Sequence, residues 1–204
     1  MGKIRQKNEK IILSAAEFVF AINGFDGATM NKISLQAKLP KANIHYYFSS
    51  KLHLYKAVFF NILELWDAEL NEMSASDNPY QAIKKYIESK LHFSKKYPYA
   101  SRVFANEVMS DAPRLKEYFV REYEQWFAKR IDVFKKWQKQ GKIDDIAPEH
   151  ILFLIWSSTQ QYADYSFQLC AAMGKETLND ADFQTASEVL THIILKGIGA
   201  KLSD

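Results

Sequence analysis

The sequence predicts an all-α protein in which a small N-terminal three-helix head, residues 1–50, is followed by a larger C-terminal helical bundle, residues 51–204. Every segment with regular apolar spacing has the three-to-four-residue repeat of a helix, and none alternates with the period of two that marks a strand. Polar clusters with Gly or Pro interrupt these segments at short intervals. With 204 residues, 48% of them hydrophobic, the chain can bury one large core or two small ones.

The first helix is predicted from a run of apolar residues that ends at a glycine. Its apolar positions are Ile11, Ile12, Ala15, Phe18, Val19 and Ile22. Asn23-Gly24 follows directly, and glycine commonly ends a helix because it adopts the left-handed backbone at little cost. We expect this helix to close over the two helices that follow it.

Residues 29–55 have the pattern of a helix-turn-helix. Thr29 is placed to cap the first of its helices, because a threonine hydroxyl can accept a hydrogen bond from an unpaired amide of the first turn. Ile33 and Ala37, four residues apart, share the buried face of that helix. The turn is expected at Lys38-Leu39-Pro40.

The helix after the turn, residues 41–48, is predicted to have one buried and one polar face. Ile44 and Phe48, again four apart, form the buried face. The outward positions are Lys41, Asn43, His45 and Tyr47. These side chains supply the hydrogen-bonding groups that base edges and phosphates require.

The rest of the chain is predicted as helices joined by short polar loops. A connector helix begins near Ser49, and residues 74–79 end it. Its apolar stripe consists of Tyr55, Val58, Phe59, Ile62, Leu63, Trp66 and Leu70. Further helices are expected at residues 79–96, 99–109, 113–140, 148–172 and 182–200.

The charge of the chain is unevenly distributed, although its net value is only +3. Residues 1–53 contain eight Lys or Arg and three Asp or Glu, whereas the rest of the chain is net negative. A basic segment is often no more than a solvated surface. Beside a helix-turn-helix, however, it also provides the cations that neutralise DNA phosphates. The head is therefore the end that we expect to meet double-stranded DNA.

The head resembles that of the TetR family of transcriptional repressors. The resemblance rests on residues 11–20, on Gly24-Phe25 followed by Thr29, and above all on residues 46–58, YYFSSKLHLYKAV. It implies a ligand-responsive repressor that binds a palindromic operator as a homodimer. Together with the outward positions of the second helix, it assigns to DNA binding Thr29, Lys41, Asn43, His45, Tyr46, Tyr47 and Lys51.

One departure from the family lies in the turn. The family pattern is alanine, glycine, valine and serine, where this chain has Ala37-Lys38-Leu39-Pro40. Glycine is usual at the second position because the left-handed backbone costs it little. Pro40 replaces a capping serine, and a proline is accepted in the first helical turn because the amide there has no intrahelical partner. We therefore expect the turn to be kept.

The C-terminal part resembles the pyrimidine-utilisation repressors, the branch of the TetR family that senses uracil and thymine. The matching stretches are KYPYASRVFANEV, QGKIDDIAPEH and ILFLIWSSTQQYADY. In that branch, a tryptophan of the connector helix and the tryptophan and glutamine of a WxSTQ segment line the pocket. In this sequence, these positions fall on Trp66, Trp156 and Gln160.

The chemistry of these residues is compatible with a pocket and also with an ordinary core. Trp156 and Gln160, four apart, are neighbours on one helix face. An indole can stack on a flat ring, and a primary amide complements the N–H and C=O edge of a uracil-like ring. Tryptophans on apolar faces are nevertheless more often core residues, and a buried glutamine can be satisfied by a protein neighbour as well as by a ligand. Further candidates for the pocket wall are Phe104, Asn106 and Glu107.

The last helix has an apolar face that suits a homodimer contact. Its members are Phe183, Ala186, Val189, Leu190, Ile193 and Ile194, and Gly197 allows a partner helix to approach. Paired with the 148–172 helix, it would form a four-helix interface across a two-fold axis. The contact residues that we expect at its centre are Val189, Leu190 and Ile193.

Nothing in the sequence indicates an enzyme or a metal protein. It has no glycine-rich phosphate loop and no HExxH sequence, and the single Cys170 has no metal or redox cluster beside it. No cofactor is expected, and uracil and thymine are the candidate effectors. The single cysteine and the lack of a leader or a membrane-length apolar run predict a cytoplasmic protein. Two alternatives stay open: a TetR-like repressor of another small, flat or apolar effector, and a helical scaffold without specific operator recognition.

Overall fold

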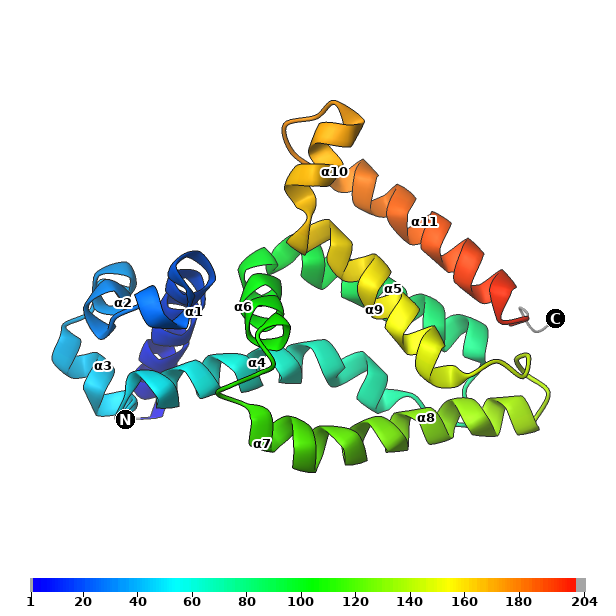
Figure 1. Cartoon of the computed structure of the whole chain (residues 1–204), viewed down its shortest axis with the longest axis horizontal. Helices are drawn as coiled ribbons and strands as arrows, with labels where there is room; N and C mark the ends of the chain where they lie inside the picture. Colours follow the sequence, from blue (N-terminus) through cyan, green and yellow to red (C-terminus); the bar gives the residue numbers. More distant parts are fainter. Residues whose placement is uncertain (1, 201–204) are drawn as a thin grey trace. The chain divides into compact units, whose positions relative to one another are not determined.

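The computed structural model describes residues 2–200, with side chains from residue 4 on. All regular elements in this part of the chain are helical, which confirms the predicted fold class (Figure 1). The elements are α1 (Gly2–Gly27), α2 (Met30–Ala37), α3 (Lys41–Tyr47), α4 (Lys51–Glu72), α5 (Pro79–Lys96), α6 (Pro98–Met109), α7 (Lys116–Tyr118), the π-helical turn η1 (Phe119–Tyr123), α8 (Glu124–Lys139), α9 (Pro148–Asp164), α10 (Ser166–Met173) and α11 (Asp180–Gly197). None of these helices is both long and apolar enough to cross a membrane.

The described chain forms two compact units. Unit 1 contains the described residues up to Leu65 together with Tyr99–Lys116, and unit 2 contains Trp66–Pro98 and the described residues from Glu117 on. Unit 1 therefore comprises α1–α3, the first part of α4 and α6, and it is larger than the head of residues 1–50 expected from the sequence.

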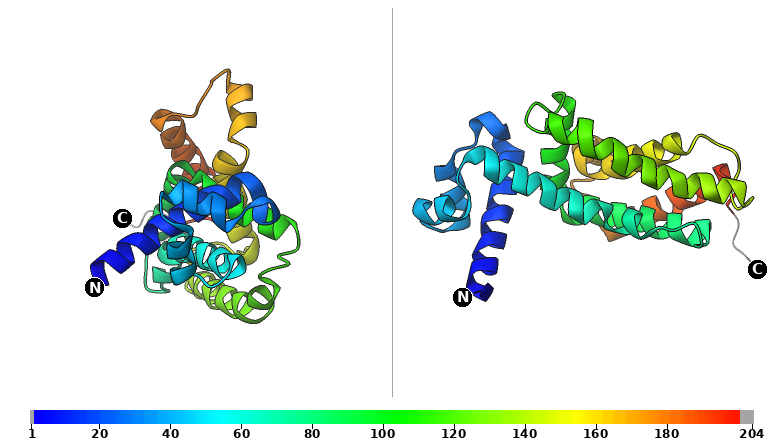
Figure 2. Two further views of the ribbon diagram at one scale, coloured as in Figure 1. Left: turned by 90° about the vertical axis from the view of Figure 1, so that its left-hand side faces the viewer. Right: turned by 90° about the horizontal axis from the view of Figure 1, so that it is seen from below.

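Within unit 1, α1 packs against α2, and α2 against α3 (Figure 2). The inward side of α1 consists of Ile12, Ala15, Ala16, Val19 and Phe20. Ile11 and Ile22, which the sequence placed on this side, are exposed, because Ala16 and Phe20 occupy the inward positions instead. Gly24, with φ of 66° and ψ of 177°, breaks the helical backbone at the predicted stop.

The helix-turn-helix has the predicted cap and a left-handed turn residue. The Thr29 hydroxyl accepts a hydrogen bond from the Lys32 amide at 3.2 Å. Lys38 has φ of 54° and ψ of 37°, and its amide donates to carbonyls of the last turn of α2. The Leu39 amide also donates to that turn, at 3.1 Å from the Ser34 oxygen. This is the helix ending that glycine favours, and a residue with a side chain adopts it at a cost of about 1 kcal/mol.

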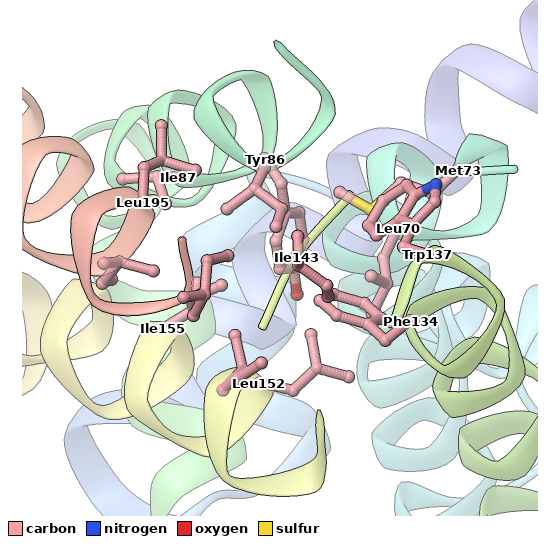
Figure 3. Close-up of a cluster of buried hydrophobic side chains, with 14 of the residues drawn as sticks. Leu70, Met73, Tyr86, Ile87, Phe134, Trp137, Ile143, Leu152, Ile155 and Leu195 are labelled. Atoms are coloured by element: carbon pink, nitrogen blue, oxygen red, sulfur yellow. The ribbon is translucent and has the colours of Figure 1, made fainter. Parts of the chain in front are cut away.

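Unit 2 is a helical bundle around one apolar core. Helix α5 packs against both α9 and α11, and α8 packs against α9. The core drawn in Figure 3 receives side chains from these helices, the end of α4 and the loop before α9, among them Leu70, Met73, Tyr86, Ile87, Phe134, Trp137, Ile143, Leu152, Ile155 and Leu195. Helix α11 begins with a capping box, in which Asn179 and Asp182 each accept the backbone amide of the other.

Two predicted helices are interrupted. The helix expected at residues 113–140 begins at Lys116 and contains the π-helical turn η1. Within η1, Phe119 and Tyr123 lie 5.1 Å apart between ring centroids. The helix expected at residues 148–172 is divided at Tyr165, whose φ of −116° and ψ of 25° are not helical.

Candidate nucleic-acid and effector sites

Helix α3 presents a polar face next to a buried anchor. Ile44 and Phe48 are buried, as predicted. The exposed candidates are Lys41, His45 and Tyr46, and the half-buried ones are Asn43 and Tyr47. Tyr46 is 75% exposed, and its ring meets that of Tyr47 edge to face, with 5.2 Å between centroids. An aromatic ring so exposed beside polar groups is available to a partner.

Thr29 and Lys51 are both engaged in holding the head together. The Thr29 side chain is exposed, and its hydroxyl can still donate a hydrogen bond while it caps α2. The Lys51 ammonium donates to the carbonyl oxygens of Phe25 at 2.8 Å and Ala28 at 3.0 Å, and it lies 4.3 Å from the centroid of the Phe25 ring. In this structure, Lys51 therefore ties the start of α4 to the connection between α1 and α2.

A buried carboxylate joins α6 to α4 and to Arg114 inside unit 1. Glu107 is 1% exposed, and it accepts hydrogen bonds from the Tyr55 hydroxyl at 2.9 Å, the Arg114 amide at 2.8 Å and the Arg114 guanidinium at 3.3 Å. The same guanidinium contacts both oxygens of Asp26 at 3.2 Å and lies over the Phe25 ring. Burial and the bond to Glu107 both raise the pKa of Tyr55. Glu107, a candidate for the pocket wall from sequence, is thus part of an ion-pair network.

In unit 2, the two tryptophans assigned to the effector contact successive turns of α5. The indole N–H of Trp156 on α9 donates to the Tyr86 hydroxyl at 2.6 Å. The Lys90 ammonium, one turn further along α5, lies 4.1 Å from the ring centroid of Trp66 on α4. Tyr86 and Lys90 are both buried. The structure thus places Trp66 and Trp156 against the same face of one helix.

Further aromatic rings extend the wall that begins at Trp156. Trp126 stacks on it with 6.5 Å between centroids and 22° between planes, and Tyr123 stacks on Trp126 at 5.4 Å. The Trp126 indole N–H donates to Asn71 at 2.8 Å, which fixes α8 beside the end of α4. Such rings form flat apolar surfaces with few internal degrees of freedom.

The same region contains a buried cation and a partly buried carboxylate. Burial lowers the pKa of Lys90 to about 8, and the carboxylates of Asp67 and Asp164 oppose this shift. Burial raises the pKa of Asp67 to about 6, opposed by Lys90 and Arg130. At neutral pH, Lys90 is therefore mainly protonated and Asp67 mainly ionised.

Gln160 lies one helical turn from Trp156 and is half-buried. Its side-chain amide makes no hydrogen bond to another group of the described chain. Thr159, the preceding residue, is fully buried, and its carbonyl oxygen accepts from Ser94 of α5 at 2.9 Å. This bond helps to hold α9, which carries Gln160, on α5.

The apolar stripe of α11 is buried along one flank and exposed along the other. Ala186 and Ile194 are buried inside unit 2, whereas Val189 and Ile193 are 48% and 57% exposed. Leu190 is half-buried. The six residues predicted as one interface therefore do not form one exposed face, but two of the three expected contact residues are open to a partner.

Sequence analysis missed Lys90, Tyr86 and Asp67 as members of the region around the tryptophans. The sequence did contain an indication for Lys90, because it lies three residues after Ile87 and seven after Ile83 on the buried side of α5. A lysine is rarely buried at an apolar position of an amphipathic helix unless its charge is paired or has a function. The described residues contain no cluster of His, Cys, Asp or Glu that could hold a metal ion.

Comparisons with known proteins match both the head and the C-terminal part. Residues 12–58 match the bacterial regulatory proteins of the tetR family, and residues 59–201 match the C-terminal region of YcdC-like proteins. The HTH-type transcriptional regulator RutR of Escherichia coli K12 is 38% identical over 190 residues, which cover 93% of this chain and 90% of that protein. The chain belongs to the TetR family.

Solved structures show the same fold for this TetR-family protein. A transcriptional regulator from Streptomyces coelicolor has a TM-score of 0.73 at 21% identity, with 94% of this chain and 98% of that chain covered. A TetR-family transcription regulator from Marinobacter aquaeolei has a TM-score of 0.71 at 17% identity, with 94% and 97% covered. Because the chain matches the TetR-family models and is 38% identical to RutR, it is a DNA-binding transcriptional regulator and not an enzyme, and regulators of this family act as dimers.

Proposed function

We propose that this TetR-family regulator represses pyrimidine-utilisation genes and is released from its operator by uracil or thymine. The observation that carries the proposal is the placement of Trp66 and Trp156 on one face of α5, with Gln160 one turn from Trp156. Indole rings suit the stacking of a flat ring, and a primary amide suits its N–H and C=O edge. The likeness of the C-terminal part to the pyrimidine-utilisation branch and the 38% identity to RutR support it.

The two tryptophans and the glutamine contribute in different ways. The N–H of Trp156 is already bonded to Tyr86, so its indole offers a ring face and not a donor. The Gln160 amide has no protein partner in the described chain, so its donor and acceptor can both be used by the effector. Replacement of Gln160 should therefore weaken the binding of the effector without destabilising the fold.

The test is operator release by pyrimidines. A bound DNA sequence is first selected from random duplexes, and uracil, thymine and uridine are then titrated into the complex with fluorescence anisotropy as the readout. We expect Gln160→Leu to raise the half-point of release by uracil about 10- to 100-fold, the equivalent of one lost hydrogen bond of about 1–3 kcal/mol. Gln161→Leu, the same change at the neighbouring position, is the control and should leave the half-point unchanged.

The outcomes of the titration separate three cases. Equal half-points for the wild type and Gln160→Leu would remove Gln160 from the effector site. Absence of release from the wild type at millimolar uracil, thymine and uridine would overturn the pyrimidine assignment and leave a TetR-family regulator of another small effector. Failure to select any DNA would favour a helical scaffold.

We further propose that α3 lies in the major groove of the operator. Asn43 and His45 would contact base edges, while Lys41 would contact phosphate. The other residues assigned to DNA contacts outside the bases are Thr29, Tyr46, Tyr47 and Lys51. Replacing Lys41 by Ala should lower the slope of log affinity against log salt by up to about one unit. Lys129→Ala, at an exposed lysine of α8, is the control, and an unchanged slope for both variants would show that another surface contacts the phosphates.

The operator should be a palindrome, because the family acts as dimers. In a dimer about a two-fold axis, two α3 helices meet half-sites about 34–36 Å apart, or a multiple of that spacing. We place the dimer contact at Val189, Leu190 and Ile193 of α11, with α9 as the second helix that each protomer contributes to a four-helix arrangement. As a repressor acting on DNA, the dimer would work in the cytoplasm.

A further inference from the structure

We propose that Lys90 and Asp67 form the polar end of the effector site and select a neutral heterocycle in which a carbonyl oxygen lies next to a ring N–H. This inference rests on the proposed function, because it takes the surroundings of Trp66 and Trp156 as the effector site. It adds two contact residues and a rule of selectivity that the tryptophans and Gln160 do not supply.

The first observation is the ammonium group of a buried lysine side chain to which the described residues make no hydrogen bond. Lys90 is 4% exposed, yet within the described chain its nitrogen makes no hydrogen bond and no ion pair. Its direct contact is with the face of the Trp66 ring at 4.1 Å. That contact leaves N–H donors of the ammonium without an acceptor. Because a buried charge without hydrogen bonds is costly, an effector that brings a carbonyl oxygen gains the bond that the fold does not make.

The second observation is a carboxylate next to the same tryptophan. Asp67 follows Trp66 on α4, is half-buried, and makes no hydrogen bond within the described chain. It acts on Lys90 through space but is not within ion-pairing distance of it. Arg130, the other cation that acts on Asp67, donates to the backbone oxygens of Leu70 and Asn71 instead. The carboxylate can therefore accept a hydrogen bond from an effector N–H.

The groups around this pair determine which charges an effector can carry. The carboxylate of Asp164 acts on Lys90, and burial together with the nearby charge of Asp67 raises the pKa of Tyr118 and Tyr123. Two cations, Lys90 and Arg130, and two carboxylates, Asp67 and Asp164, nearly cancel in charge, so a net charge on the effector would gain little attraction here. A neutral ring with a carbonyl acceptor and an N–H donor side by side matches both members of the pair. An unsubstituted pyrimidinedione has this edge.

The test compares uracil with 1,3-dimethyluracil, which keeps both carbonyl oxygens and has no N–H. Isothermal titration calorimetry is performed on the wild type, Lys90→Met, Asp67→Asn and the control Lys84→Met, at a half-buried position of the same helix that is ion-paired with Glu88. We expect Lys90→Met to weaken uracil binding about 10- to 100-fold, as the loss of a charge-assisted hydrogen bond implies. Asp67→Asn should reduce the affinity for uracil more than that for 1,3-dimethyluracil. Lys84→Met should bind both like the wild type.

A second measurement tests whether Lys90 and Asp67 stabilise the fold and not the bound ligand. The double variant Asp67→Asn/Lys90→Met removes both charges, and in the absence of ligand we expect its Tm to equal or exceed that of the wild type, as for other buried charges replaced together. A Tm lower by more than about 5 °C would show that the two charges hold unit 2 together, and it would overturn the assignment.

The outcomes distinguish this inference from the proposed function. If Lys90→Met and the wild type bind uracil equally well, Lys90 is not a contact residue, while the pyrimidine function stands. If the wild type binds no uracil, the proposed function and the selectivity rule both fail, whatever the Tm of the double variant. Weaker uracil binding by Lys90→Met, together with an undiminished Tm of the double variant, supports the inference.

Discussion

Removal of the Arg114 guanidinium should destabilise unit 1 by about 3 kcal/mol. Glu107 is 1% exposed, and without Arg114 it would retain only the Tyr55 hydroxyl and one backbone amide as donors. Removing one partner of a buried ion pair costs about 3–5 kcal/mol. We reduce this cost to about 2–3 kcal/mol for two reasons. Two hydrogen-bond donors to Glu107 remain, and the Arg114 side chain is 22% exposed, so that water can take the place of the guanidinium. Loss of the guanidinium from the Phe25 ring adds about 0.5–1 kcal/mol.

The assay is the unfolding of Arg114→Ala in urea, monitored by circular dichroism. The protomer concentration is kept fixed, because dimerisation makes the stability depend on concentration. Arg121→Ala is the matched control. Arg121 forms an ion pair with Glu117 in which the two side chains are 74% and 73% exposed. Such exposed pairs contribute less than about 1 kcal/mol to the free energy of unfolding. Total stabilities are about 5–15 kcal/mol, so the difference between the two variants is readily measured.

Two results would refute the reasoning behind this prediction. A loss for Arg114→Ala no larger than that for Arg121→Ala would show that Glu107 does not depend on the guanidinium. The second test adds Glu107→Gln to complete a double-mutant cycle, for which we expect a coupling energy of about 1–3 kcal/mol. A coupling energy near zero would mean that the two side chains contribute independently, despite their contact at 3.3 Å.

Three further changes have defined outcomes. Lys38→Gly should raise the free energy of unfolding by about 0.5–1 kcal/mol, because glycine adopts the left-handed backbone without strain; a lower midpoint in urea would contradict this. Ile193→Asp should convert the dimer to a monomer in light scattering, since an unpaired charge in a buried interface costs several kcal/mol. The control Ile22→Asp, at a similarly exposed isoleucine of α1, should remain dimeric. A dimer for both variants would show that the interface lies elsewhere. Burial raises the pKa of Glu17 to about 7, so the folded state holds its proton more strongly than the unfolded state, and stability should fall as the pH rises from about 4.5 to about 7. Glu17→Gln should reduce this decrease in pH-dependent unfolding, and an unchanged pH profile would show that Glu17 is not responsible.

The helices were predictable where one local rule determined their ends. The proline-led start of α5 at Pro79 and its end at Lys96 agree with the sequence prediction, because Asn78 caps the first turn and a second proline follows at residue 98. The break at Gly24 was predictable for the same kind of reason. In both places, the backbone preference of single residues decides the structure.

Other features depend on packing between segments that are distant in the sequence. The turn η1 brings Tyr123 against Trp126 and Phe127, and no apolar repeat indicates one additional residue in a turn. Likewise, Lys51 has the exposed, basic character of a DNA contact in the sequence, but the carbonyls of Phe25 and Ala28, more than twenty residues earlier, bind its ammonium. The candidate effector residues Trp66 and Trp156 were identified by resemblance, whereas their neighbours Lys90 and Tyr86 became visible only in the folded chain.

The composition of unit 1 limits where such a regulator can be cut or recombined. The unit is assembled from two stretches of chain, and residues 99–116 supply Tyr99 against Phe18, Phe104 against Phe59, and Glu107 to Tyr55. A fragment that ends at Leu65 would lose all three contacts and expose the faces that residues 99–116 cover. Anyone constructing a chimeric sensor from this protein, with its DNA specificity and another effector domain, should therefore transfer residues 99–116 together with the head and place the junctions next to Leu65, Tyr99 and Lys116.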